Sequence, residues 1–348
     1  MMRCDRRSRP FRRFVLALVG GMLLASGLAP VRPLAAEEAS AIRVGFGYGI
    51  GFLPLMIADK LKLLERRAEA AAGRAIPVSY LRFSGSAAMQ DAILTGNVEV
   101  GGYGVPGLLI AWEKTRGLPQ EIVGLAGITT GALTLVTSNP AVKSVRDFGK
   151  NDRIAMPATT SPQMYLLQMA AERDLGPDKV DALKPQVVSL PHPEAVNALL
   201  SRTEVTAYFA SAPFTQIVLA DPKIHAVLTS EDVFGGQASF LVLAATKRFA
   251  DQNPRLVEAM VAAIDEAAAL IASDPMRAAE IYLEAEPTKG VTPELIAKLL
   301  KEPGNGFGAE VRGVKRYADF MVRLGQLRAA PADWRAVFLP VLHGREGS

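Results

Sequence analysis

Glycine, serine, threonine and aromatic residues gather in the loops that follow the strand-like segments of this chain. Glycine lets backbone N–H groups approach a ligand closely, and serine and threonine hydroxyls can donate hydrogen bonds to it. Because these loops hold almost no charge, they favour binding of a small solute over acid–base catalysis. The candidate binding residues are Tyr48, Phe52, Ser84, Ser86, Tyr103, Thr129, Thr130, Thr159, Thr160, Gln163, Phe209 and Ser211.

The polar residues in these loops also have a purely structural interpretation. Ser84, Thr160 and Ser161 precede helix-like segments and could be only N-caps. Helix starts also attract anions, and without lysine or arginine in the loops an anionic group would be held by neutral donors and helix ends. The convergence of several such loops at one edge of a parallel sheet is the stronger signal for a binding site.

Motifs for catalysis and for cofactors are missing from the sequence. The glycine run Gly45–Gly51 has Ile50 where a dinucleotide-binding fingerprint needs glycine. The three histidines, His192, His225 and His343, lack the spacing of metal ligands. His192 follows a predicted strand and is the best candidate for a general base, but we interpret it as a surface or capping histidine. We therefore expect no enzyme activity, no cofactor and no metal.

The first 36 residues have the pattern of a secretory signal peptide. Arginines precede the apolar run Phe14–Leu28, and Ala35-Ala36 ends the segment. The run is shorter than the about 20 residues that span a bilayer, although an N-terminal membrane anchor is the alternative. Arg12-Arg13 also loosely matches a twin-arginine signal. We expect cleavage near Ala36 and a periplasmic location.

Charge and cysteine content change when this leader is set aside. The sequence has 39 Lys+Arg and 35 Asp+Glu; seven arginines and one aspartate lie in the leader, which leaves 32 basic and 34 acidic residues. A body with a net charge of −2 gives no case for nucleic-acid binding. Cys4, the single cysteine, also lies in the leader, so the body can form no disulfide or thiolate metal site.

Strand-like and helix-like segments alternate from Ile42 to Thr246, which predicts an α/β fold with mainly parallel sheets. Leu53–Leu64 has the apolar spacing of one helix. After Arg248 the pattern is helical only. Three helices are predicted to begin at a capping residue followed by proline, namely at Asn253-Pro254, Asp274-Pro275 and Thr292-Pro293.

The order of these segments resembles the periplasmic substrate-binding proteins of the nitrate, sulfonate, taurine and thiamine-precursor ABC importers. The resemblance covers about residues 42–275, and it lies in the order and spacing of its motifs rather than in one of them. The matching segments are Phe52–Ala58, Phe83-Ser84-Gly85-Ser86, Gly104-Val105-Pro106, Arg153–Pro157 with Thr159-Thr160-Ser161, and Tyr208–Phe214.

The resemblance implies a type II periplasmic binding protein fold of two α/β lobes with the ligand in the cleft between them. It places the crossovers between lobes near Gly131 and near Gly235-Gly236. Residues 41–131 and 238–348, with the C-terminal helices, would form lobe 1, and residues 132–237 would form lobe 2. Tyr103 and the Tyr208–Ser211 segment depart from the family pattern, which leaves the ligand open.

The function implied is the solute-binding component of an ABC importer, with a membrane permease and an ATPase as partners and the protein itself a monomer. The solute would be a small organic or inorganic anion, such as a sulfonate, nitrate or taurine, or an aromatic or pyrimidine compound. The alternatives are an enzyme on the same fold that acts on a thiamine- or menaquinone-type precursor, with His192 as its base, and a ligand-sensing partner of a membrane receptor.

Overall fold

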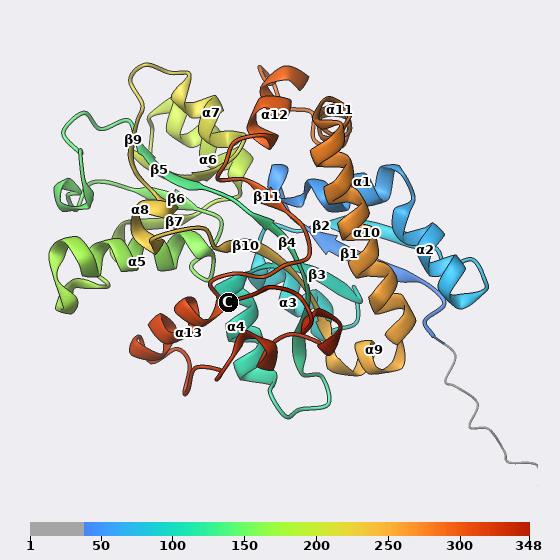
Figure 1. Cartoon of the computed structure of the whole chain (residues 1–348). Helices are drawn as coiled ribbons and strands as arrows, with labels where there is room; N and C mark the ends of the chain where they lie inside the picture. Colours follow the sequence, from blue (N-terminus) through green and yellow to red (C-terminus); the bar gives the residue numbers. More distant parts are fainter. Residues whose placement is uncertain (1–37) are drawn as a thin grey trace, which may run out of the picture. The chain divides into compact units, whose positions relative to one another are not determined.

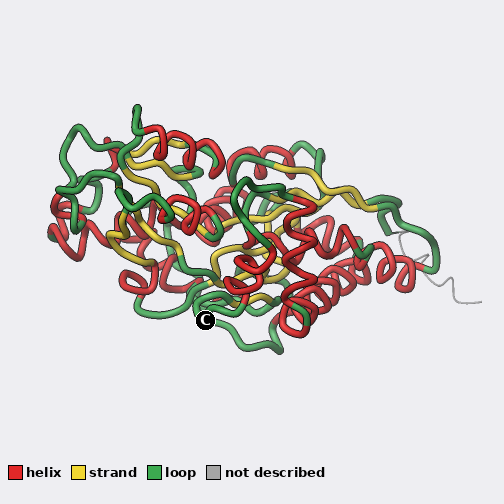
Figure 2. The backbone as a smooth tube through the Cα atoms, turned by 90° about the horizontal axis from the view of Figure 1, so that it is seen from above, coloured by secondary structure: helices red, strands yellow, loops and turns green. Residues whose placement is uncertain are grey.

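The computed structural model describes residues 38–348, so the expected signal peptide, residues 1–36, lies outside the described residues. Residues 38–348 form one body that contains two β-sheets, each with helices packed around it (Figure 1). Seen from above, helices lie on both sides of the strands (Figure 2). Within this part of the chain, no helix is long and apolar enough to cross a membrane.

The first sheet has the strand order β11-β4-β10-β3-β1-β2. β1 pairs in parallel with β2 and with β3, which requires crossover connections, and α1, α2 and α3 provide them. The strands are β1 Ile42–Phe46, β2 Val78–Arg82, β3 Val100–Gly104, β4 Ile122–Thr130, β10 Ser239–Thr246 and β11 Gly306–Phe307. The helices between them are α1 Leu53–Lys60, α2 Leu63–Ala72, α3 Ser86–Leu94, α4 Val105–Thr115 and α9 Lys247–Gln252.

The second sheet has the order β7-β6-β8-β5-β9 and is built from one continuous stretch of chain. Its strands are β5 Leu133–Thr137, β6 Ile154–Met156, β7 Val187–Ser189, β8 Ala207–Ser211 and β9 His225–Thr229. Its helices are α5 Pro162–Leu175, α6 His192–Ser201, α7 Phe214–Leu219 and α8 Ser230–Phe234.

The two-lobed α/β fold is confirmed, and both sheets are mixed rather than mainly parallel. In each sheet the strand that enters from the other sheet is antiparallel to its neighbours, and in the first sheet the short edge strand β11 is antiparallel to β4 as well. β10 enters from the second sheet and lies antiparallel between β3 and β4, and β5 enters from the first sheet and lies antiparallel between β8 and β9. Strands that are joined by a helical crossover within one sheet run parallel to each other, and β10 and β5 are not joined to their neighbours in that way.

The segment predicted as one helix, Leu53–Leu64, is divided into α1 and α2. Lys62 has a positive φ of 54°, which ends a right-handed helix, and Leu61 is exposed. Leu53 and Ile57 are fully buried, so the predicted apolar face is present on α1. The sequence prediction failed because no glycine or proline marks the break.

The C-terminal helices begin where proline predicts them. They are α10 Pro254–Ser273, α11 Pro275–Ala285 and α12 Pro293–Leu300. A further helix, α13 Val314–Arg323, follows Gly313 and has no proline at its start. The side chains of Asp274 and Thr292 accept hydrogen bonds from the backbone of their helices, as N-caps do. The long helix α10 packs against α1 and α2, which are connections of the first sheet (Figure 1).

Candidate functional site

A cavity of about 60 Å³ lies where loops from the two sheets meet. The loops after β1, β2 and β6 contribute to it, as do the end of β3 and the starts of α6 and β10. In open α/β sheets this edge is the usual ligand position. No aspartate, glutamate, lysine or arginine is among the described residues that line it. The lining is Gly47, Tyr48, Phe52, Phe83, Ser84, Gly85, Ser86, Met89, Gly102, Gly104, Pro157, Ala158, Ser161, Pro162, Gln163, His192, Phe240 and Leu241.

Two glycines of β3 allow close packing at the cavity. A Cβ atom at Gly102 would lie 2.5 Å from Cε1 of Phe52, and one at Gly104 would lie 2.4 Å from Cδ of Pro162. Any side chain at either position would clash, so only glycine fits. The first contact sets the Phe52 ring against β3. The second brings the start of α5, from the second sheet, directly against a strand of the first.

The start of α5 presents buried polar groups that lack partners. Gln163 is 1% exposed, and neither its Nε2 nor its Oε1 has a hydrogen-bond partner. Ser161 is the N-cap of α5, but its side chain makes no capping bond, and its buried Oγ is unpaired. The Oγ1 of Thr160 is also buried and unpaired, whereas Thr159 is exposed. An unsatisfied buried polar group costs about 1–3 kcal/mol, so this arrangement suits groups that a ligand completes.

His192 is buried beside the cavity, and the expectation of a surface or capping histidine is wrong. Its Nδ1 is hydrogen-bonded to the hydroxyl of Tyr208, and its Nε2 lies 3.2 Å from the Oγ of Ser211. The ring stacks on Phe214 with 5.1 Å between ring centroids. Burial lowers the pKa of His192 to about 3. The imidazole is therefore neutral near pH 7 and is a weak base with both nitrogens engaged.

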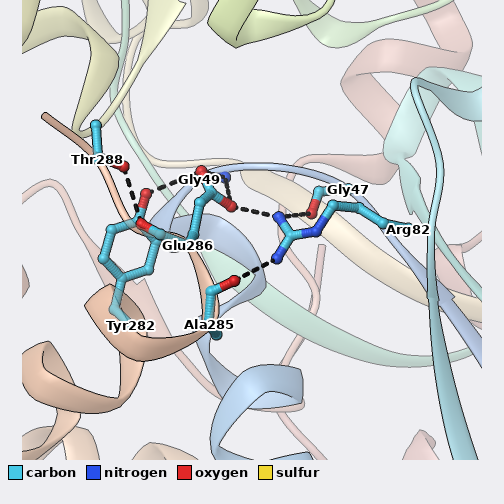
Figure 3. Close-up of polar contacts among 7 residues, drawn as sticks. All are labelled: Gly47, Gly49, Arg82, Tyr282, Ala285, Glu286 and Thr288. Atoms are coloured by element: carbon cyan, nitrogen blue, oxygen red, sulfur yellow. Dashed lines mark hydrogen bonds and ion pairs between the residues drawn. The ribbon is translucent and has the colours of Figure 1, made fainter.

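A second polar network holds the glycine loop after β1 from outside the cavity (Figure 3). Glu286, which follows α11, is buried, and its carboxylate accepts from Gly49 N at 3.1 Å and from Arg82 Nη1 at 2.5 Å. The hydroxyl of Tyr282 donates to the same carboxylate at 3.0 Å. The Arg82 guanidinium also lies 4.9 Å from the ring centroid of Tyr48. The Arg82 guanidinium is therefore engaged in these structural contacts, and Arg82 does not line the cavity.

The structure brings some of the expected site residues together and leaves others apart. Tyr48, Phe52, Ser84, Ser86 and Gln163 line the cavity. The expected residues that do not line it are Tyr103, Thr129, Thr130, Thr159, Thr160, Phe209 and Ser211.

Strand geometry explains where several of these other residues lie. Tyr103 and Phe209 are fully buried in the sheets. Side chains alternate between the two faces of a strand, so Tyr103 points away from the face that Gly102 and Gly104 present to the cavity. Thr129 and Thr130 donate hydrogen bonds to the carbonyl of Gly306 on β11, at 2.8 and 3.4 Å.

Sequence reasoning missed part of the lining. Phe240 and Leu241 lie at the start of β10, and they reach this edge because β10 runs antiparallel to its neighbours. A search of the residues after each strand cannot find them. Glu286 lies in the helical tail, and no signal in the sequence links it to the glycine loop. Ser161 was visible as a helix start, but its lack of a capping bond was not.

Among the described residues, no group of histidine, cysteine and acidic side chains could hold a metal ion. No functionally curated protein matches the sequence. The chain resembles the periplasmic nitrate-binding protein of Synechocystis PCC 6803, with a TM-score of 0.67 and 16% identity over 87% of this chain and 86% of that chain. It also resembles the alkanesulfonate-binding protein of Xanthomonas axonopodis pv. citri bound to MOPS, with a TM-score of 0.63 and 18% identity over 84% and 95%.

A Candida albicans protein described as having the generic periplasmic binding protein fold is similar as well, with a TM-score of 0.62 and 13% identity over 84% of this chain and 92% of that chain. At these identities the likeness shows a shared fold. The sequence itself matches a family model over residues 35–283, a range that includes the second sheet and all strands of the first sheet except β11. Because this match spans well over half of the sequence, the chain belongs to the NMT1-like family.

Proposed function

We propose that this protein is the extracytoplasmic solute-binding component of an ABC importer. The observation that carries the proposal is the cavity between the loops of the two sheets, with the unpaired Gln163 on its wall. Membership of the NMT1-like family and the likeness to nitrate- and sulfonate-binding proteins support the same role. Tyr48, Phe52, Ser84, Ser86, Ser161 and Gln163 would contact the solute.

The proposed mechanism is closure of the two lobes around a solute. The chain passes between the sheets twice, after β4 and before β10, and two short connections of this kind form a hinge. Lobe 1 would comprise residues 41–131 and 238–348, and lobe 2 residues 132–237. Ile50 N donates to Ala212 O at 3.3 Å, a direct contact between the loops of the two sheets that closure would make. The loaded monomer would deliver its solute to a membrane permease driven by an ATPase.

The alternative of an enzyme on the same fold draws no support from His192. A base with a pKa of about 3 is almost never protonated near pH 7 and has little tendency to take a proton. Ser211 and Tyr208 occupy both of its nitrogens. We therefore assign His192 to the wall of the cavity and expect a bound solute to be released unchanged.

A thermal-shift screen of the purified mature chain tests the proposed function. The panel contains sulfonates, nitrate, carboxylates, aromatic acids, amides and pyrimidines. A solute that binds the folded chain raises the melting temperature, by an amount that follows its concentration over its Kd. Mass spectrometry of the recovered solute then separates binding from catalysis. A chemically converted solute, or no stabilising solute in the whole panel, would contradict the proposal.

Export belongs to the same proposal and has its own measurement. We expect the mature chain to begin near Glu37, because Ala35-Ala36 ends the predicted leader. N-terminal sequencing of protein from the periplasmic fraction checks this position. An intact Met1 on membrane-bound protein would show instead that the N-terminal segment is an anchor.

A further inference from the structure

Gln163 places a hydrogen-bond donor and an acceptor side by side on the cavity wall. Its side chain is almost fully buried, and both amide atoms lack partners. A carboxamide has two N–H donors and one acceptor oxygen. A ligand that pairs with both amide atoms of Gln163 must therefore present an acceptor next to a donor on one edge. This requirement holds for either orientation of the amide. An anion would pair with Nε2 but would set its own lone pairs against those of Oε1.

The surroundings of Gln163 supply no positive charge to hold an anion. Arg82 is bound to Glu286 outside the cavity, and His192 is a neutral imidazole. The first residue of α5 is Pro162, which has no N–H, so this helix start is a poorer anion site than most. The first turn of α3 keeps its N–H groups and does favour an anion.

Apart from Tyr48, Ser84, Ser86 and Ser161, the remaining side chains of the lining are apolar, and three of them are aromatic. Phe52, Phe83 and Phe240 contribute rings, and Met89 and Leu241 contribute flexible apolar side chains. Such a wall favours contact with a flat apolar body, because it removes apolar surface from water.

Given the solute-binding role proposed above, we propose that the cavity takes an uncharged solute with a carboxamide or lactam edge on an apolar body. Gln163 pairs with the edge through two hydrogen bonds, and Ser161 adds a third polar contact beside it. The aromatic rings contact the body of the solute. This class differs from the sulfonate and nitrate in the names of the similar solved structures.

Two matched series of small compounds test this class by isothermal titration calorimetry on the mature chain. One series is acetamide, acetate and methanesulfonate, and the other is benzamide, benzoate and benzenesulfonate. Within a series the body is constant and the polar end changes from amide to anion. We expect an amide to bind at least about tenfold more tightly than its two anions, the factor for one lost hydrogen bond.

Two glutamine variants on the same helix separate recognition from folding. Gln163→Met keeps the length of the side chain and removes both amide atoms, so it should weaken amide binding about tenfold or more without loss of stability. Gln168→Met is the control, because Gln168 is buried on α5 but donates to Asp181 Oδ1 at 2.7 Å and does not line the cavity. It should lower the melting temperature and leave the affinity unchanged.

The possible outcomes distinguish this inference from the proposed function. Tighter binding of an anion, or an amide affinity that Gln163→Met leaves unchanged, overturns the amide class. Failure of both amides to bind overturns it as well. In each case a solute found in the thermal-shift screen still supports the proposed function, whereas a screen without any stabilising solute removes both.

Discussion

At the residue scale, the buried imidazole of His192 gives the protein a defined sensitivity to acid. Burial lowers its pKa to about 3 in the folded chain, whereas an unfolded histidine titrates near about 6.5. Between these values the unfolded chain binds a proton that the folded chain does not. The neutral, buried His192 therefore makes its full contribution to the free energy of unfolding above about pH 6.5. As the pH falls below this value, the free energy of unfolding decreases by up to about 1.4 kcal/mol per pH unit.

His192→Gln removes this titration and keeps polar atoms near Tyr208 and Ser211. The free energy of unfolding of the variant should fall less than that of the wild type between about pH 7 and about pH 4. Above about pH 7 the difference between the two proteins should be constant, which serves as the internal control. Urea melts across this range measure both. Parallel loss of stability in the two proteins would show that His192 is not the group responsible.

Ser161 and Thr292 offer a comparison of two helix starts. Thr292 accepts a capping bond from Leu295 N at 3.3 Å, whereas Ser161 makes none. Thr292→Ala should lower the free energy of unfolding by about 1 kcal/mol, and Ser161→Ala by less than about 0.5 kcal/mol. Only Ser161→Ala should weaken solute binding. Denaturant melts and calorimetry measure the two effects. If Ser161→Ala lowered stability alone, Ser161 would be a simple cap.

The sequence predicts part of the cavity lining, both polar and aromatic, and misses the rest. Tyr48, Ser84 and Gln163 were found because parallel strands bring their following loops to one edge. Tyr103 was misplaced because the faces of a strand alternate, and a loop-based search ignores this alternation. Phe240 could not be found at all, since its position depends on the direction of β10, which only the three-dimensional pairing sets.

At the element scale, Glu286 ties the end of α11 to the glycine loop after β1. Glu286→Gln keeps an acceptor for Gly49 N but leaves Arg82 without its charge partner. Because this pair is largely buried, the free energy of unfolding should fall by about 1–3 kcal/mol. The solute should also bind more weakly, because Tyr48 and Phe52, which line the cavity, flank Gly49 in the segment after β1. Denaturant melts and calorimetry of the variant check both results.

Glu284→Gln is the matched control for Glu286→Gln, two residues closer to the start of α11. Glu284 pairs with Lys60 at 2.6 Å, and both side chains are about half exposed, at 48% and 49%. Water and salt screen such a pair, so this variant should melt like the wild type. Equal losses in the two variants would mean that the burial of the Glu286 pair does not matter.

At the scale of the whole molecule, an engineered disulfide tests the proposed closure. A Cβ atom on Gly85, after β2, would lie 3.7 Å from the Cβ of Ala158, after β6. This spacing lies within the about 3.5–4.5 Å found in disulfides. The double variant Gly85→Cys with Ala158→Cys should therefore link the two lobes on oxidation. In a chain cleaved as proposed above, no native thiol would compete, since Cys4 is the single cysteine of the sequence.

Oxidation in the presence of solute should trap the solute and slow its dissociation, whereas oxidation beforehand should slow its entry. Reduction with a thiol should restore both rates, which controls for damage by the substitutions. Stopped-flow measurements of association and dissociation read the two effects. Equal rates in the oxidised and reduced forms would mean that the lobes need not separate for solute exchange.

The position of β10 has a further consequence, which concerns the order of folding. β3 and β4 do not pair with each other, so the middle of the first sheet is incomplete until β10 is inserted between them. In the sequence, β10 follows all the strands of the second sheet. Contacts between residues so distant in sequence form slowly. The second sheet, by contrast, uses one continuous segment. In pulsed hydrogen exchange during refolding, the amides of β5 and β8 should gain protection before those of β3 and β4. The N-terminal lobe would thus be the last part of a newly made chain to become native.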